Sequence, residues 1–254
     1  MTLSNRKILR TLLCLLAGTL YAVCLSACDA KEPLSENRDA EIESPVIAND
    51  LSNQKVTAIA EDTQGHIWIG TFRGLNKNNV HDYHQYFCTD DSLGLPDNQI
   101  THLLRDSKNR FWVGTVNGVC LYTDKDNFRI IPIEADNKNV RQILEDRNGR
   151  IFLNTGFQLY AYHPREEKIT CVLPEISPGN AFYAQCHIAP DNNLWVMTST
   201  GLRCYDPSTL QLKESVALSG YPYYSYLHNN ELWITGNHTC LLYTSPSPRD
   251  MRRS

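Results

Sequence analysis

The amino-acid sequence predicts an all-β fold, an incomplete β-propeller of about four to five blades, and three observations support that prediction. A short hairpin with a central aromatic residue recurs along the 254 residues. The recurrences lie about 40 residues apart, which is typical of propeller blades built from short strands. Glycine or asparagine stands at the turn of every copy. The alternative architecture is one β-sandwich that contains a few similar hairpins.

The first copy of the hairpin reads EDTQGHIWIGTFRGL and spans residues 61–75. Its first turn ends at Gly65 and its second at Gly74, and glycine adopts the positive φ that such turns require. Between the turns, Trp68 points to one face of a strand and the isoleucines on either side of it point to the other. Both faces of the strand are therefore apolar, which indicates a sheet that is covered on both sides, as a blade is by its two neighbours.

Five copies of the hairpin can be recognised, each with a central aromatic residue that we call the anchor. The anchors are spaced by 44, 40, 43 and 38 residues and are Trp68, Trp112, Phe152, Trp195 and Trp233. Three residues before each anchor stands a residue that tolerates a left-handed turn conformation, namely Gly65, Asn109, Gly149, Asn192 or Asn230. The aspartate that begins the turn is kept in the first three copies only. The residues that we expect to maintain the repeats are Asp62, Gly65, Trp68, Gly70, Gly74, Asp106, Trp112, Gly114, Gly118, Asp146, Gly149, Phe152, Trp195, Gly201 and Trp233.

The first repeat illustrates the four strands that we expect in each blade. They are predicted at 56–61, 67–71, 75–76 and 81–87, and a connector at 88–99 crosses to the next blade. The connector contains Leu-Gly-Leu-Pro-Asp-Asn, which is rich in residues that interrupt strands. Later connectors are predicted at 136–139, 177–181 and 220–222.

The hairpin sequences resemble a known repeat. The phrase D-x-x-G-x-I/F-W-I/V-G-T-x-x-G-L/V, preceded by L-S-N-Q-K-V or L-P-D-N-Q-I, is similar to the two-component regulator propeller repeat, and the resemblance extends over residues 51–239. It implies the periplasmic sensor region of a hybrid two-component histidine kinase, with which glycan-degrading Gram-negative bacteria switch on polysaccharide-utilisation genes. It also implies a seven-bladed ring, so that roughly two further repeats, a β-sandwich and a kinase would follow in the full-length protein.

The amino-terminal residues have the pattern of an export signal, because basic residues near the start precede an uncharged stretch at 11–28. The stretch ends in Leu-Ser-Ala-Cys, which resembles the lipobox of bacterial lipoproteins, where the cysteine is acylated. We therefore expect residues 1–28 to be a signal peptide, with lipidation at Cys28. The protein would then be membrane-anchored, in the periplasm or on the outer surface of a Gram-negative bacterium. A plain signal peptide and an uncleaved anchor helix are the alternatives, and each also places the rest of the chain outside the cytoplasm.

The segments on either side of the repeats are expected to lie outside the propeller. Residues 29–49 are acidic and poor in apolar side chains, so we expect an extended, solvated linker. Residues 240–254 begin with CLLYTSPSPRD, which matches the translation of a sequencing-library adapter. We expect this tail to be non-native and to pack against nothing. The propeller at 50–239 is then an open set of blades whose last blade ends after its second strand.

The composition argues against several classes of function. The formal net charge of −4 becomes more negative without the basic signal, which disfavours nucleic acid as a partner. The aspartate turn is similar to the Asp-box of sialidases, but no second signature supplies the arginine triad, the tyrosine and the acid that sialidase catalysis needs. His81 and His84 would face opposite ways on a strand, which argues against a shared metal ion. We expect no cofactor, no metal and no catalytic residue in this part of the chain.

Five cysteines lie within the predicted propeller: Cys88, Cys120, Cys171, Cys186 and Cys204. Their number is odd and no CxxC pair is present. An oxidising compartment is compatible with one disulfide, but the apolar strand contexts of Cys120 and Cys204 favour buried free thiols.

Chain direction places the blade connectors and the turns between second and third strands at the same end of every blade. The residues that we expect at this rim are Phe72, Arg73, Asp97, Asn98, Asn117 and Tyr224. Aromatic and planar polar groups suit stacking on a sugar and hydrogen bonding to it, so the first hypothesis is a sensor that binds a small glycan. The alternatives are a stand-alone lipoprotein that acts as a binding or docking platform, and a propeller glycosidase or lyase.

Overall fold

The computed structural model describes residues 45–89, 94–123, 125–176, 184–199, 201–218, 222–228, 231–236, 239–244 and 252–253. The chain divides into two compact units, Met1–Glu41 and Ile42–Ser254, and every described residue belongs to the second. The predicted signal with Cys28 and most of the predicted linker therefore lie outside the described residues. No helix within the described part is long and apolar enough to cross a membrane.

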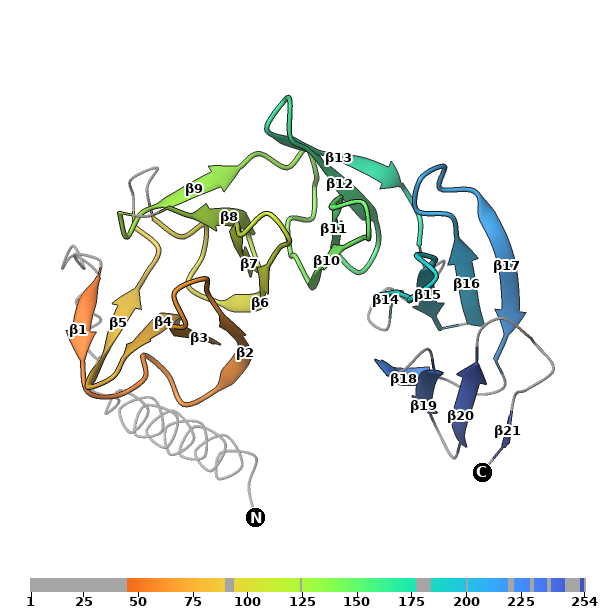
Figure 1. The fold of residues 1–254 in the computed structure, drawn as a ribbon, viewed down its shortest axis with the longest axis horizontal. Helices are drawn as coiled ribbons and strands as arrows, with labels where there is room; N and C mark the ends of the chain where they lie inside the picture. The colour runs from red at the N-terminus through yellow and green to blue at the C-terminus, as the bar shows by residue number, and fades with distance from the viewer. Residues whose placement is uncertain are drawn as a thin grey trace, which may run out of the picture. The chain divides into compact units, whose positions relative to one another are not determined.

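Within the described ranges, five antiparallel sheets follow one another along the chain (Figure 1). The first contains β2 (Val56–Glu61), β3 (Ile67–Thr71), β4 (Gly74–Asn79) and β5 (Asp82–Tyr86), with β1 (Val46–Ala48) outside β5. The second contains β6 (Ile100–Arg105), β7 (Phe111–Thr115), β8 (Gly118–Tyr122) and β9 (Phe128–Ile131). The third contains β10 (Gln142–Glu145), β11 (Ile151–Asn154), β12 (Leu159–His163) and β13 (Lys168–Leu173). The fourth contains β14 (Gln185–Ile188), β15 (Leu194–Thr198), β16 (Gly201–Tyr205) and β17 (Leu212–Ala217), and the fifth β18 (Pro222–His228), β19 (Glu231–Gly236), β20 (Thr239–Thr244) and β21 (Arg252–Arg253).

Apart from β1, which pairs with β5, each sheet is a meander in which strands that are consecutive in the chain pair with each other. The first strands of successive sheets, β2, β6, β10, β14 and β18, lie next to one another. These sheets are therefore propeller blades, and their first strands are the inner ones. The five sheets do not close into a ring (Figure 1). The predicted fold, an incomplete all-β propeller of about four to five blades, is confirmed.

The aspartate turns fix the anchor residues in place. Asp62 Oδ1 accepts the backbone N–H groups of Gln64 and His66 at 2.8 and 3.0 Å, and its Oδ2 accepts the indole Nε1–H of Trp68 at 2.9 Å. Asp106 accepts the corresponding bond from Trp112 at 2.8 Å. Burial opposes the ionisation of Asp62, but the hydrogen bonds outweigh it and hold the pKa of this carboxyl below its usual value. The aspartate turn of these two repeats is thus a structural element that orients a tryptophan.

The turn residue three positions before each anchor has the predicted left-handed conformation wherever it is described. Its φ is 85° at Gly65, 62° at Asn109, 73° at Gly149 and 65° at Asn192. The fifth such residue, Asn230, lies outside the described residues. Glycine and asparagine are therefore interchangeable here because both tolerate this backbone region.

Neighbouring blades pack by one repeated contact. The anchor of each blade lies in a core cluster with the two residues that flank the anchor of the following blade. Trp68 packs with Phe111 and Val113 in this way, and its ring centroid lies 5.0 Å from that of Phe111. The same relation holds for the next three anchors, which pack with Ile151 and Leu153, with Leu194 and Val196, and with Leu232 and Ile234. The apolar face on each side of the anchor strand, predicted from the sequence, is the contact between blades.

Two predictions about the ends of the propeller are wrong. The end of the predicted linker forms β1, which pairs with β5 from Val46↔Gln85 to Ala48↔Tyr83. The start of the predicted unpacked tail forms β20, which pairs with β19, and Arg252–Arg253 pairs with β20 in turn. The fifth blade is therefore not cut after its second strand. In both places an extended segment satisfies the free backbone groups of an edge strand, and an acidic or a foreign-looking composition does not prevent that pairing.

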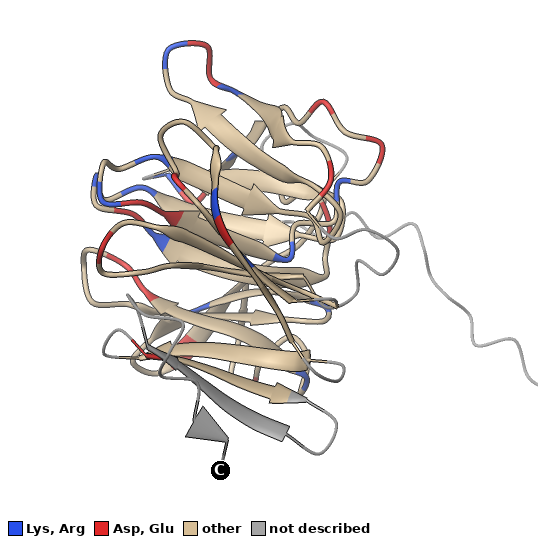
Figure 2. Ribbon diagram, turned by 90° about the vertical axis from the view of Figure 1, so that its right-hand side faces the viewer, with Lys and Arg blue, Asp and Glu red and all other residues tan. Residues whose placement is uncertain are grey.

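Charged side chains gather at the ends of the strands. Figure 2 shows Lys, Arg, Asp and Glu mostly in turns and connectors, while the strands themselves are largely uncharged. This distribution agrees with sheets that are covered on both faces by their neighbours.

Candidate functional site

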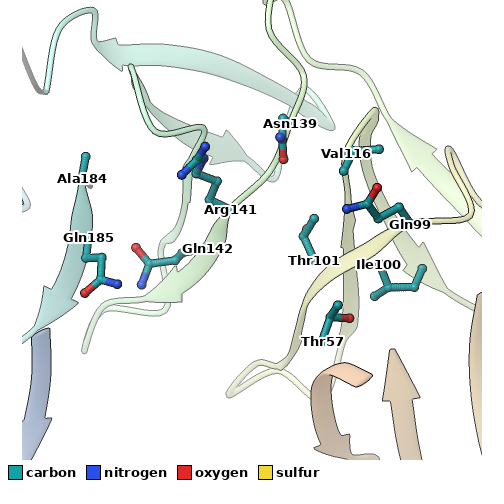
Figure 3. Close-up of a pocket in the computed structure, with 10 residues that line it drawn as sticks. All are labelled: Thr57, Gln99, Ile100, Thr101, Val116, Asn139, Arg141, Gln142, Ala184 and Gln185. Atoms are coloured by element: carbon teal, nitrogen blue, oxygen red, sulfur yellow. The ribbon is translucent and has the colours of Figure 1, made fainter. Parts of the chain in front are cut away.

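A cavity of about 360 Å³ lies where the inner strands of the first four blades begin. Its ten lining residues come from four different sheets and their connectors and surround one space (Figure 3). It is at the same end of the blades as the connectors and the second-to-third strand turns, because Gln99, Asn139 and Val116 belong to those segments and line it.

Four lining residues occupy equivalent places in successive blades. In the inner strand of each blade, one residue pairs with the anchor across the sheet. In the first four blades these partners are Ala60, Leu104, Leu144 and His187. Each of the four lining residues stands three positions before the partner in its own blade. The four are Thr57, Thr101, Arg141 and Ala184. Thr57 and Thr101 lie at register shifts of β2 and β6, and such bulges turn a side chain away from its regular direction. Tyr223 has this place in the fifth blade, because Tyr226 pairs with Trp233.

The inner strands are joined by side-chain hydrogen bonds at the base of the cavity. The Gln142 amide oxygen accepts the backbone N–H of Cys186 at 2.9 Å and the Asn154 amide at 2.9 Å. The Gln185 amide oxygen accepts the backbone N–H and the hydroxyl of Ser225 at 2.6 and 2.9 Å. Thr101 Oγ1 donates to the Val140 carbonyl in the next blade. These bonds hold the inner strands in register with one another and position the groups that line the cavity.

Several polar groups of the lining have hydrogen-bonding capacity to spare. The side chain of Gln99 and the Nε2 amide of Gln185 make no hydrogen bond to the described residues. Thr57 Oγ1 and Asn139 Oδ1 are buried and have no partner within the described part of the chain. A buried polar group without a partner costs about 1–3 kcal/mol. The cavity is therefore suited to a ligand that supplies hydrogen-bonding groups.

The charge of the lining is uneven. Arg141 is its one charged side chain, and no carboxylate is among the ten lining residues. The Arg141 backbone N–H donates to the Asn154 carbonyl at 2.8 Å, which places this residue directly before β10. The cavity is thus a set of amides and hydroxyls with one fixed positive charge.

Two histidines of the inner strands are kept neutral by burial. Burial lowers the pKa of His187 to about 4 and also lowers that of His102, where a hydrogen bond from the ring to the Ile143 backbone works in the opposite direction. His187 Nε2 lies 2.7 Å from Ser225 Oγ and so connects the fourth blade to the fifth. Neither histidine lines the cavity, so both contribute to the contacts between blades.

None of the six residues predicted to form the ligand rim is among the residues that line the cavity. Asn98 and Asn117 are each adjacent in sequence to a lining residue, Gln99 or Val116. Asn98 Oδ1 accepts the backbone N–H of Cys88 at 2.7 Å, and Asp97 Oδ1 accepts that of Gln99 at 2.8 Å, so both shape the connector.

The remaining three predicted rim residues lie farther apart in the sequence. Phe72 and Arg73 are exposed in the first blade, where Lys55 Nζ lies 3.8 Å from the Phe72 ring centroid. Tyr224 lies near the start of β18, where its side chain is 57% exposed. A ligand-binding role for the six residues stays a prediction.

A second, smaller cavity of about 160 Å³ lies between the first and second blades, and the polar side chains that line it form hydrogen bonds with residues of these two blades. The hydroxyls of Tyr86 and Tyr122 both donate to Asp126 Oδ1 at 2.7 Å, and Lys77 Nζ donates to the Tyr122 hydroxyl at 3.3 Å. Burial opposes the ionisation of Asp126, but the two tyrosine hydrogen bonds lower its pKa. Arg105 Nη1 donates to the Asp62 carbonyl at 3.0 Å. This network connects two blades and leaves its charged groups paired.

The five cysteines Cys88, Cys120, Cys171, Cys186 and Cys204 are free thiols. Cys120 and Cys204 are buried, as predicted, and burial raises the pKa of the Cys204 thiol to about 11. Cys88 and Cys171 are exposed. No group of three or more His, Cys, Asp and Glu side chains within the described residues is arranged to hold a metal ion.

The repeats match a known family. Residues 50–73 and 94–117 match the family described as two component regulator propeller. No curated protein matches the chain in sequence. The chain thus carries at least these two repeats of the family, at the first two hairpins and the segments that precede them.

Solved structures share the fold. The extracellular domain of a protein described as a hybrid two component system from B. thetaiotaomicron is 22% identical with a TM-score of 0.60, and the match covers 82% of this chain and 30% of that one. Virginiamycin B lyase from Staphylococcus aureus is 17% identical with a TM-score of 0.62, and the match covers 82% of this chain and 73% of that one. A streptogramin B lyase is 15% identical with a TM-score of 0.62, over 85% of this chain and 74% of that one. At these identities the likeness shows the propeller fold alone.

Proposed function

We propose that this chain, which carries two-component regulator propeller repeats, is the extracytoplasmic sensor region of a hybrid two-component histidine kinase and binds an oligosaccharide. The repeat match and the fold shared with an extracellular domain of a hybrid two component system support the sensor. The cavity of about 360 Å³ carries the binding proposal, because its lining is mostly amides and hydroxyls. Such groups pair with sugar hydroxyls, and the space accommodates a ligand of small to moderate size.

This region is proposed to be non-catalytic. Lyases share the fold, but fold alone does not carry an activity. The cavity lining contains no carboxylate, histidine, cysteine or tyrosine that could act as an acid, a base or a nucleophile. A stand-alone lipoprotein that serves as a docking platform is the second candidate, favoured by the sequence around Cys28.

The binding proposal is tested with the full-length protein on an array of glycan oligomers. Gln99→Ala removes an amide from the cavity without breaking a side-chain hydrogen bond to the described residues. We expect it to weaken glycan binding about 2- to 10-fold, the effect of one neutral hydrogen bond. Gln211→Ala, at an exposed position far along the chain before β17, is the matched control. If no glycan binds, or if Gln99→Ala binds as tightly as the control, the cavity is not the sugar site.

Anchoring through Cys28 is tested separately. Metabolic labelling with palmitate should mark the wild-type protein, and Cys28→Ser should abolish the label. Persistence of the label in Cys28→Ser would contradict the lipobox reading of residues 25–28. A β-sandwich and a kinase encoded directly after the propeller would separate the sensor from the stand-alone lipoprotein.

A further inference from the structure

We infer that the open face of the first blade and the open face of the fifth are two halves of one contact, and that a second copy of this chain covers each of them, head to tail. The first-blade surface, which we call the acceptor face, contains Ile59, Ile67 and Ile69. The fifth-blade surface, which we call the anchor face, contains Tyr224, Tyr226 and Trp233. The inference goes beyond the proposed function and does not depend on the ligand of the cavity.

Inside the propeller, an anchor is covered by three apolar positions of the following blade. Trp68 lies in one core cluster with Phe111 and Val113, which flank the next anchor. The cluster also contains Leu103 of β6, which pairs with Val113. The same three positions cover the next two anchors, and they are Ile143, Ile151 and Leu153 in the third blade and Cys186, Leu194 and Val196 in the fourth. The molecule thus shows repeatedly which surface buries an anchor.

The first blade carries the same three positions. Ile59 of β2 pairs with Ile69 of β3, the pairing that Leu103 makes in the second blade. Ile67 precedes the anchor of its blade, as Phe111 does in the second. In the second blade these positions are buried, whereas Ile59 and Ile67 are exposed. The first blade therefore has the surface that buries an anchor, and none of the core clusters of the described residues includes it.

A polar group of the first blade points to the same partner. Glu145 pairs with the residue before the third anchor, and its carboxylate accepts the backbone N–H and the hydroxyl of Ser107 in the preceding blade at 2.8 and 2.5 Å. Glu61 pairs with Ile67, the residue before the first anchor, and so has the same place. Its side chain is exposed and makes no hydrogen bond within the described part of the chain. The acceptor face is therefore suited to a preceding blade by a polar group as well as by apolar ones.

The anchor face of the fifth blade supplies the other half of the contact. Trp233 and its pairing partner Tyr226 lie on the same face of the sheet as Tyr224, and all three side chains are exposed. Tryptophan and tyrosine are among the residues that contribute most to protein interfaces when they are buried. The five sheets of one copy do not close into a ring, so the two faces do not meet within it (Figure 1). A head-to-tail contact between copies brings them together.

The test is sedimentation velocity of the complete 254-residue chain over a series of concentrations. We expect the mass to rise with concentration, because each copy presents one face of each kind. Trp233→Ala should weaken this association roughly 30-fold, as is typical of a tryptophan at the centre of an interface. Ile59→Lys should weaken it to a similar degree, because it places a charge in an apolar contact.

The chain offers a matched control for each variant. Phe157→Ala removes an exposed aromatic ring that belongs to neither face. Ile47→Lys changes an isoleucine of β1 that is as exposed as Ile59. Ile47 is connected to Trp68 through successive cross-strand pairs, so it lies on the opposite face of the first blade from Ile59. Both control variants should associate as the wild type does.

Mixing the two test variants determines the direction of the contact. Trp233→Ala retains the acceptor face and Ile59→Lys retains the anchor face, so the mixture should form dimers and nothing larger. Dimers in the mixture also show that both variants are folded. A chain that stays monomeric at every concentration overturns the inference and leaves the two faces to further repeats of a longer protein. Association that neither variant weakens, or that mixing does not restore, overturns the head-to-tail contact.

Discussion

The anchors of the first four blades and the anchor of the fifth are the same kind of residue in different surroundings. Trp68, Trp112, Phe152 and Trp195 are 0, 0, 1 and 3% exposed, whereas Trp233 is 41% exposed. The fifth anchor keeps its strand and its flanking residues, because Leu232 and Ile234 are buried against the fourth blade. An anchor is therefore fully buried only where a following blade covers it.

The first blade shows the complementary side of the same contact. Ile67 and Ile69 flank its anchor in the way that Phe111 and Val113 flank the next one, but Ile67 is 37% exposed and the neighbouring Ile59 is 66% exposed. Phe111 and Val113 are 4 and 0% exposed because Trp68 packs on them. The first blade therefore presents a surface that accepts an anchor, and the fifth presents an anchor.

The largest effect that tests this comparison is expected from truncating the two tryptophans. Trp112→Ala should lower the free energy of unfolding by about 3–5 kcal/mol, because a fully buried aromatic side chain leaves a cavity between two blades. Trp233→Ala should cost less than about 1 kcal/mol, since its ring is partly exposed. Urea unfolding of both variants measures the difference. Equal losses would show that the anchor stabilises its own blade.

A pH titration sharpens the comparison at the seam between the fourth and fifth blades. His187 has a pKa of about 4 in the folded protein against an ordinary value of 6.5, so the folded state favours the neutral ring. The stability from this residue is fully present above pH 6.5 and is lost as the pH falls toward 4. The loss is on the order of 2–3 kcal/mol for a shift of this size.

The measurement is the difference in unfolding free energy between wild type and His187→Gln from pH 7.5 to pH 4. The glutamine variant retains a polar side chain near Ser225 but has no ionisation in this range. We expect the stability advantage of the wild type to shrink with falling pH. An advantage that stays constant across the range would contradict the buried neutral histidine.

A smaller effect is expected from the residue two positions after the anchor. A Cβ added at Gly70 would lie 2.6 Å from Ile100 Cγ2 of the next blade, so Gly70→Ala should cost about 1–3 kcal/mol through overpacking. Thr235 has the same place in the fifth blade and is exposed. Thr235→Ala should change the stability by no more than about 0.5 kcal/mol. Thermal unfolding of the two variants compares a blade that is covered by the next blade with one that is not. An equal change in stability would show that Ile100 moves aside for the added methyl group at little cost.

The sequence was sufficient to predict the blades because each depends on local signals. Strands β2 and β3 coincide with the predicted ranges, since the turn at Gly65 and the apolar residues beside Trp68 lie within one hairpin. The turn conformations of Asn109 and Asn192 followed from the same local reasoning. The pairing of the edge strands could not be predicted in this way. The pairing of β1 with β5 and of β20 with β19 depends on backbone groups that any extended segment can satisfy.

The cavity could not be predicted because its residues come together only when the blades stack. Thr57 and Arg141 are far apart in the sequence, and each looks like an ordinary polar residue at the start of a strand. A signal was nevertheless present, since both stand at the same distance before their anchors, and aligning the repeats on the anchors would have placed them together. The predicted rim residues Asn98 and Asn117 are adjacent in sequence to the lining residues Gln99 and Val116.

The direction of the anchor contact has a consequence for synthesis of the chain. Because each anchor is buried by the blade that comes later, the apolar surface of a newly made blade stays uncovered until the next repeat has emerged. Folding from the amino end would then proceed one repeat behind synthesis, with the anchor of the last blade made exposed at each stage, as Trp233 is here.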